Sequence, residues 1–214
     1  MKTDDLVTAL AADFEASRVR PNRRFALALA AGFVVSAVVL VAAIGLRRDI
    51  GAAVASPRFL FKFVVTLTLA AAAAASLTDT LRPTPAAHPW RIAALLAIAP
   101  ALLALAVALE LLSAPSAQWW PRLVGANARW CLVFIPLLAA APLAALLTFA
   151  RTGAPASPRA AGAVAGLLSG GLGAALYASH CTDDSPLFVS VWYVIAIGVV
   201  GCVGAALGSR WLRW

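Results

Sequence analysis

Long uninterrupted apolar runs dominate this 214-residue chain and limit what it can fold into. The first run, Phe25 to Leu46, contains no charged residue. About 20 apolar residues are enough to cross a bilayer as a helix. Hydrophobic residues make up 63% of the chain and charged residues only 12%, whereas about a quarter of an ordinary soluble domain is charged. The sequence therefore predicts an integral membrane protein.

Six apolar segments of this kind follow one another along the chain. They are too long and too uniformly apolar for the alternating strands of a membrane barrel, so we expect an all-α bundle of six transmembrane helices. The expected spans are Phe25–Leu46, Phe59–Thr78, Ile92–Leu112, Trp130–Ala150, Ala160–Ser179 and Pro186–Ser209. Lys62 lies early in the second span, and we expect its side chain to extend outward to the membrane surface. This organisation divides the chain into a cytoplasmic segment, 1–24, and a transmembrane domain, 25–214.

Basic residues are distributed unequally between the two sides of such a bundle. If the N-terminus is inside, the inner segments hold 11 of the 17 lysines and arginines and the outer segments hold 6. Positive charge marks the cytoplasmic side of membrane proteins. We therefore predict a bacterial inner-membrane protein with both termini in the cytoplasm. The loop 180–185 and the start of the fourth span then face outward.

Residues 178–188 read ASHCTDDSPLF, a polar interruption between two apolar runs. The predicted topology places Cys181 in this loop and Cys131, at the start of the fourth span, at the same end of the bundle. The outward compartment is oxidising, so the two thiols are candidates for a disulfide, a soft-metal site or a reactive pair. His180, Asp183 and Asp184 would add nitrogen and oxygen ligands.

A structural interpretation of the same loop stays open beside the chemical one. Asp183 or Asp184 would then cap the sixth span, with Pro186 in its first turn. The third cysteine, Cys202, lies deep in that span, where we expect a small buried apolar residue. Glu110, the only carboxylate within a span, is a minor candidate for proton relay.

Glycines recur at every fourth position in the last two spans. The fifth span carries Gly162, Gly166 and Gly170, and the sixth carries Gly204 and Gly208. Small residues at this spacing allow two membrane helices to approach closely. We therefore interpret these glycine faces as sites of close packing between helices.

The N-terminal segment predicts a short amphipathic helix. Asp4 and Asp5 suit the start of a helix, and Leu6, Leu10 and Phe14 fall on one face with Val7 beside them. Helices that rest on lipid usually carry lysine and arginine on their polar face, but this polar face is acidic. That favours a groove on a partner protein as the surface that the apolar face binds.

Three stretches together carry a family resemblance: TDDLVTALAAD at the N-terminus, SPRFLFK before the second span and HCTDDSPLFVSVWY around the polar loop. They resemble the NrsF family of six-span bacterial anti-sigma factors, over essentially the whole chain. The resemblance implies that the cytoplasmic N-terminal segment holds an extracytoplasmic-function (ECF) sigma factor of the sigma-F type. It also implies that outward cysteines, here Cys131 and Cys181, respond to metal or oxidative stress. It gives no role to Cys202 and no direct contact with nucleic acid.

Two other classes of function remain as alternatives. One is a membrane thiol–disulfide redox protein, and the other is a small transporter of a metal or solute. Neither has a use for the apolar face of the N-terminal segment, and the chain carries no Walker motif, catalytic triad or zinc-protease motif. We expect a regulator and not an enzyme, with no resident cofactor beyond a transient heavy-metal ion at Cys131 and Cys181.

Overall fold

The computed structural model describes residues 20–81 and 89–212, which contain helices and connecting loops and no strand. Six helices in these ranges are long and apolar enough to cross a membrane: Arg23–Ile44, Pro57–Thr80, Pro89–Ser113, Ala128–Ala150, Pro158–Ala178 and Pro186–Trp211. The predicted all-α fold with six such helices is confirmed for the described residues. The largest boundary difference is in the first helix, which is predicted from Phe25 and begins at Arg20. The third is predicted from Ile92 and begins at Pro89. The predicted N-terminal helix lies outside the described residues.

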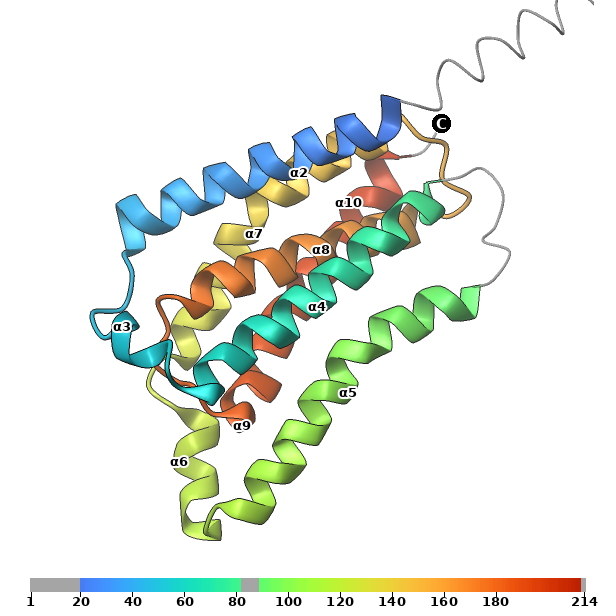
Figure 1. The fold of residues 1–214 in the computed structure, drawn as a ribbon. Helices are drawn as coiled ribbons and strands as arrows, with labels where there is room; N and C mark the ends of the chain where they lie inside the picture. The colour runs from blue at the N-terminus through green and yellow to red at the C-terminus, as the bar shows by residue number, and fades with distance from the viewer. Residues whose placement is uncertain (1–19, 82–88, 213–214) are drawn as a thin grey trace, which may run out of the picture.

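The named elements divide the bundle more finely (Figure 1). In chain order they are α2 (Arg20–Val39), the π-helical turn η1 (Leu40–Ile44), α3 (Ile50–Ala53), α4 (Pro57–Thr80), α5 (Pro89–Ser113), the 3₁₀ turn η2 (Ser116–Gln118), α6 (Trp119–Val124), α7 (Ala128–Ala150), α8 (Pro158–Ala178), α9 (Pro186–Phe188), the π-helical turn η3 (Val189–Tyr193) and α10 (Val194–Trp211). The sixth span thus consists of α9, η3 and α10.

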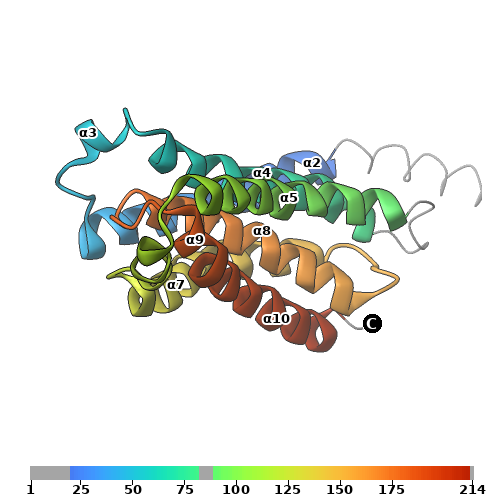
Figure 2. The same ribbon diagram turned by 90° about the horizontal axis from the view of Figure 1, so that it is seen from below.

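Helix α8 forms the centre of the bundle. It packs against α4, α7 and α10, while α2 lies along α7 (Figure 1). Seen from below, α5 lies beside α4 on one flank, away from α7 (Figure 2). Most of α8 is buried, whereas few residues of α5 are. The molecule therefore has a tightly packed core around α8 and a peripheral helix, α5.

Glycines explain how closely α8 approaches α10. A Cβ atom on Gly166 would lie 2.6 Å from the backbone oxygen of Val200, and one on Gly208 would lie 2.5 Å from that of Pro158. A Cβ on Gly162 would meet the backbone oxygen of Gly204. Real Cβ atoms do not approach backbone this closely, so only glycine fits. The predicted close packing at these glycine faces is confirmed, and the structure shows that the two faces pack against each other.

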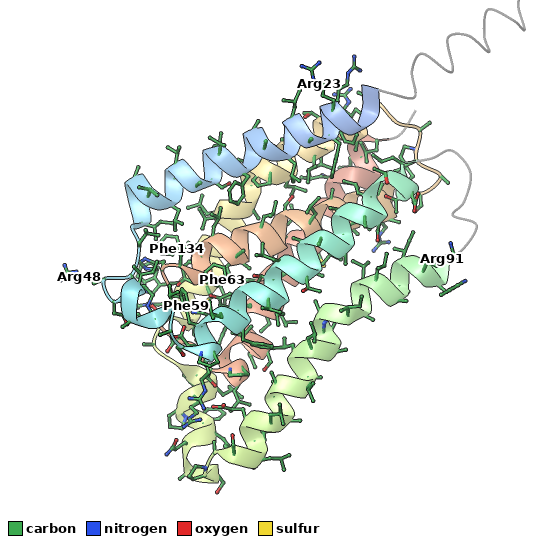
Figure 3. All side chains as sticks on the ribbon, in the orientation of Figure 1. Arg23, Arg48, Phe59, Phe63, Arg91 and Phe134 are labelled. Carbon is green, nitrogen blue, oxygen red and sulfur yellow. The ribbon has the colours of Figure 1, made fainter. Side chains whose placement is uncertain are left out.

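The two ends of the bundle are named here by the residues that lie at each. We call the end with residues 45–56, 114–127 and 179–185 the cysteine end. The other, the terminus end, holds the start of α2, the end of α10 and the loop 151–157 (Figure 1). Side chains of Arg23 and Arg91 project from the terminus end, while Arg48 projects from the cysteine end (Figure 3).

Candidate functional site: a buried cysteine pair

Cys131 and Cys181 come together at the cysteine end of the bundle. Cys131 lies in the first turns of α7, and its backbone nitrogen donates to the carbonyl of Asn127 at 3.0 Å. Cys181 follows the end of α8, and its nitrogen donates to the carbonyl of Tyr177 at 3.0 Å. Both thiols are free and fully buried, and their side chains interact directly. The structure thus brings together two residues 50 positions apart that the predicted topology placed at the same end of the bundle.

Lys62 reaches this site from α4 and is fully buried. Its ammonium group donates to the carbonyl of Cys181 at 2.8 Å and pairs with Asp184 at 2.5 Å. It also lies 5.4 Å from the ring centroid of Phe59. The prediction that this side chain extends outward to the membrane surface is wrong, because a carbonyl and a carboxylate inside the bundle replace the water that it would otherwise seek.

Arg47 lies in the loop after η1 and ties it to the loop 179–185, which contains Cys181. Its guanidinium donates to Asp184 at 3.0 Å and to the carbonyl of Cys181 at 3.4 Å, while its backbone nitrogen donates to Ser179 at 3.1 Å. On its exposed side it binds Asp49 at 2.7 Å. These carboxylates, led by the hydrogen bond to Asp49, raise the pKa of Arg47 above its ordinary value. We call Arg47, Lys62 and Asp184 the latch.

His180 and Asp183 are used structurally. The His180 ring nitrogen Nδ1 lies 3.0 Å from the carbonyl oxygen of Gly45, at the end of η1. One Asp183 oxygen accepts from the backbone nitrogens of Ala126 at 3.0 Å and Asn127 at 2.8 Å, and from the Asn127 side chain at 2.9 Å. Asp183 therefore ties the loop to the start of α7.

The prediction that Asp183 or Asp184 caps the sixth span is wrong. Asp183 serves the start of α7, and Asp184 belongs to the latch. The cap is Ser185, whose hydroxyl accepts from the backbone nitrogen of Leu187 at 3.3 Å, and Pro186 occupies the first turn as expected. Among the described residues, no group of three or more histidine, cysteine or carboxylate side chains is arranged to hold a metal ion.

The environment of Cys181 favours its thiolate. The pKa of Cys181 is lowered chiefly by a hydrogen bond from Cys131, and the positive charge of Lys62 adds to this against the cost of burial. A lowered thiol pKa increases the fraction of thiolate, which is the form that reacts with oxidants and binds soft metals. The pair thus consists of an activated thiol and a neighbour that donates to it.

Two tyrosines, absent from the sequence prediction, complete the site. Tyr177 is fully buried and Tyr193 is 1% exposed. The Tyr177 side chain lies against Cys131 and that of Tyr193 against Cys181. The one sequence signal for Tyr177 is its position one helical turn before Cys181. Tyr193 lies in η3, and π-helical turns occur often at functional sites.

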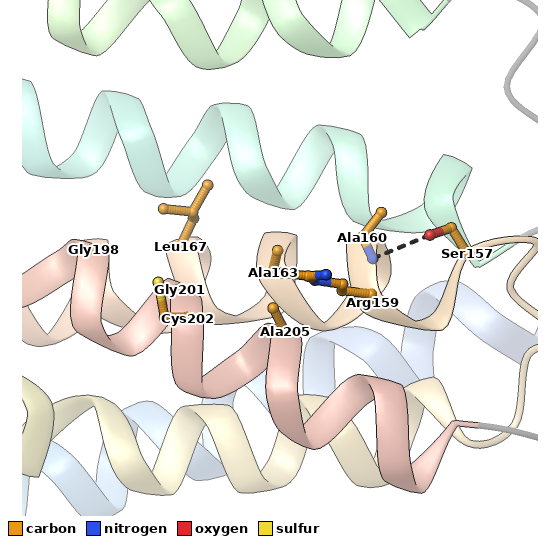
Figure 4. Close-up of a pocket in the computed structure, with 9 residues that line it drawn as sticks. All are labelled: Ser157, Arg159, Ala160, Ala163, Leu167, Gly198, Gly201, Cys202 and Ala205. Carbon is orange, nitrogen blue, oxygen red and sulfur yellow. Dashed lines mark hydrogen bonds between the residues drawn. The ribbon is translucent and has the colours of Figure 1, made fainter.

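The remaining candidates lie apart from the pair. Glu110, 5% exposed, accepts from Arg58 at 2.9 Å and pairs with Arg122, so it braces α4, α5 and α6. Cys202 is exposed and lines a groove between α8 and α10 (Figure 4). The prediction that it is buried is wrong because glycines form the buried face of α10, which turns Cys202 outward.

The predicted partner-binding residues Asp4, Asp5, Leu6, Val7, Leu10 and Phe14 lie outside the described residues.

Comparison with known proteins gives one consistent result. The chain matches the family described as NrsF, Negative regulator of sigma F, over residues 10–214. It is 32% identical over 218 residues to the Probable anti-sigma-F factor NrsF of Azospira oryzae. It is 33% identical over 217 residues to the Anti-sigma-F factor NrsF of Caulobacter vibrioides, and each alignment covers 100% of both chains. No solved structure matches the chain.

Proposed function

Since the chain belongs to the NrsF family of negative regulators of sigma F, we propose that it is a membrane-embedded anti-sigma factor whose cysteine pair controls release of the sigma factor. The partner is an ECF sigma factor of the sigma-F type, held in the cytoplasm by residues 1–24. The cysteine end faces the periplasm, where a metal ion or an oxidant reaches Cys131 and Cys181. The observation that carries the proposal is that the two buried thiols touch beneath the loop to which α2 and α4 are tied.

Helix α2 is the physical connection between the two functions. It begins at Arg20, next to the proposed sigma-binding segment, and runs to the cysteine end. There, the carbonyl oxygen of Gly45 lies 3.0 Å from the His180 ring nitrogen Nδ1, and Arg47 binds the loop that contains Cys181. Movement of that loop would therefore act directly on the helix that leads to the sigma factor.

The carbonyl of Cys181 is the point at which thiol chemistry meets the latch. Lys62 and Arg47 both donate to this oxygen, at 2.8 and 3.4 Å. A new bond at the Cys181 sulfur, to a metal or to Cys131, changes the conformation of the residue that carries this carbonyl. The latch then loses hydrogen bonds in one state that it has in the other, which is the difference that a switch requires.

The magnitude required is large but accessible to sulfur chemistry. Converting a mostly bound population into a mostly released one needs about 5 kcal/mol of preference between the states. Ligation of Zn²⁺ by the four ligands of a zinc finger provides about 10–16 kcal/mol, so two thiolate ligands supply a part of this that is comparable with the preference required. A divalent ion held only by the exposed parts of the loop would not provide this, because Asp183 and Asp184 are already committed to protein partners.

The partner half of the proposal is tested by deleting residues 1–20 and by Leu10→Asp in the full chain. Both changes should abolish co-purification of the sigma factor and derepress its promoters. Persistent repression in the deletion variant would refute the proposed binding segment.

The sensor half is tested with cysteine variants. Cys131→Ser and Cys181→Ser should abolish the transcriptional response to cadmium and peroxide while repression persists. Cys202→Ser is the matched control, because this thiol is exposed and remote from the pair, and it should respond as the unmodified chain does. An unchanged response in both Cys131→Ser and Cys181→Ser would remove the thiols from the mechanism.

A further inference from the structure

Two buried hydroxyl groups beside the thiols have no hydrogen-bond partner. They are Tyr177 and Tyr193, whose oxygens are shielded from solvent and accept or donate no hydrogen bond to any described atom. Buried polar groups are nearly always satisfied, because an unmade bond leaves the cost of desolvation uncompensated. Two such groups at one site call for an explanation in the chemistry of that site.

The surroundings leave the thiols as the neighbours of both hydroxyls. The tyrosine rings lie 6.2 Å apart. Phe134, Phe188 and the His180 ring, whose centroid lies 5.7 Å from that of Tyr177, also line the enclosure, and the His180 Nδ1 atom lies 3.0 Å from the Gly45 carbonyl. Tyr177, Tyr193, Cys131 and Cys181 belong to one buried cluster, in which the thiols are the nearest polar groups to the hydroxyls, without a hydrogen bond of normal geometry between them. A thiol is a weak hydrogen-bond acceptor, so the reduced pair does not satisfy either hydroxyl. An oxygen atom attached to sulfur would.

We propose that Tyr177 and Tyr193 form an oxyanion pocket that stabilises a sulfenate on Cys181 during its oxidation by a hydroperoxide. The inference rests on the proposed function only in taking the pair as reactive thiols. Its physical basis is preorganisation: donors already held where negative charge will develop need no rearrangement when it appears. The full burial of both thiols restricts the reagent to a small molecule such as hydrogen peroxide.

The chemistry balances in two steps. The Cys181 thiolate attacks one peroxide oxygen, an S–O bond forms, the O–O bond breaks, and the leaving hydroxide takes the remaining proton to give water and a sulfenate. Cys181 is oxidised by two electrons and the peroxide is reduced. The Cys131 thiol then attacks the Cys181 sulfur, the S–S bond forms, and the S–O bond breaks. The oxygen leaves with the Cys131 proton as hydroxide.

The test uses the full purified chain and measures the two steps separately. Hydrogen peroxide is added and then quenched, and the protein is denatured in N-ethylmaleimide to block the remaining thiols. The fraction of chains with a Cys131–Cys181 disulfide is then measured by mass spectrometry. The first step is isolated in a Cys131→Ser background, where the sulfenate persists and is trapped with dimedone. Tyr193→Phe should slow formation of the trapped species, and Tyr177→Phe should slow disulfide formation, each by about a hundredfold, the lower end of the range for losing one oxyanion donor.

The melting temperature is a second measurement, and the proposal predicts that it does not fall when the oxidation rate falls. Tyr→Phe removes an unsatisfied hydroxyl and keeps the ring, so the melting temperature should stay equal or rise while oxidation slows. Phe134→Leu is the matched control, because it alters packing on Tyr177 and leaves both hydroxyls in place. Its oxidation rate should match that of the unmodified chain.

Three results would overturn the pocket: equal oxidation rates in the unmodified chain and both Tyr→Phe variants, slowing in Phe134→Leu as large as in Tyr→Phe, or no peroxide oxidation of Cys181 at all. The test does not involve sigma-factor release. A normal oxidation chemistry with no release would therefore contradict the proposed function and leave the pocket standing.

Discussion

The two ends of α8 are held in different ways. Towards the terminus end, Gly162 and Gly166 bring its backbone against the backbone of α10, and no charged group takes part. At the cysteine end, the loop that follows α8 is held by the latch and by the contact of its His180 ring with the Gly45 carbonyl. The first contact depends on excluded volume, which no oxidant or metal changes. The second contact depends on charges and hydrogen bonds around a thiol, and an oxidant or a metal ion can change these.

This difference indicates which part of the molecule is able to respond. Interdigitated backbones do not deform gradually, because close-packed interiors have little free space. Polar contacts around Cys181 can be exchanged for others at modest cost when the sulfur acquires a new bond. We therefore expect the glycine contact to act as a fixed reference against which the cysteine loop and α2 move.

The largest predicted effect comes from breaking the fixed end. Gly162→Leu or Gly204→Leu places a side chain on the opposing backbone, so the variants should lose at least about 3 kcal/mol, the upper range for overpacking. The expected observation is loss of a folded, monodisperse protein in detergent. Gly198→Leu in the same helix is the matched control, because its Cβ meets nothing within 4 Å. Normal stability of Gly162→Leu would contradict the comparison.

Sequence alone predicted the regular part of this architecture well. Six helices and the glycine contact follow from local properties: the length of an apolar run, and small residues at every fourth position. The location of Cys131 and Cys181 at the same end of the bundle also followed, because two spans lie between them and an even number of crossings returns the chain to the end from which it started. These features depend on spacing within the chain, which the sequence displays directly.

The parts that sequence reasoning missed all depend on partners far along the chain. Lys62 is buried because Cys181 and Asp184, more than a hundred residues away, solvate it. Asp183 binds the start of α7 instead of the helix that it precedes in sequence. No helical or loop pattern encodes such pairings. Local patterns therefore predicted that the Lys62 side chain extends to the membrane surface and that Asp183 caps the sixth span.

The next largest effect tests the latch itself. Lys62→Met removes one buried partner of Asp184 and a donor to Cys181. Breaking a buried ion pair costs about 3–5 kcal/mol, and we expect somewhat less, because Arg47 still pairs with Asp184. Without the ammonium, the pKa of Cys181 should rise, so its alkylation in pH-stepped thiol labelling should require higher pH. Arg48→Met, at an exposed cation nearby, should change neither quantity.

A smaller effect is expected where the loop is tied to α7. Asp183→Asn keeps an oxygen but replaces the charged acceptor of the Ala126 and Asn127 amides. Hydrogen bonds to a charged group contribute about 1.5–3 kcal/mol and neutral ones about 0.5–1.5 kcal/mol, so we expect a loss of about 1 kcal/mol, measurable as a lower melting temperature. A stability equal to that of the unmodified chain would mean that the loop is positioned by the latch alone.

The smallest effect concerns the exposed side of the latch and depends on pH. The hydrogen bond from Arg47 lowers the pKa of Asp49 to about 2, below its ordinary value of 3.8. A lowered carboxyl pKa gives a stabilisation that is fully present above the ordinary pKa and is lost as pH falls through about 2. Asp49→Asn should therefore lower the melting temperature slightly and equally at pH 6 and pH 8, with the difference shrinking between pH 4 and pH 2. A difference that widened in acid would show that Asp49 is held by something other than Arg47, and the latch would then end at Asp184.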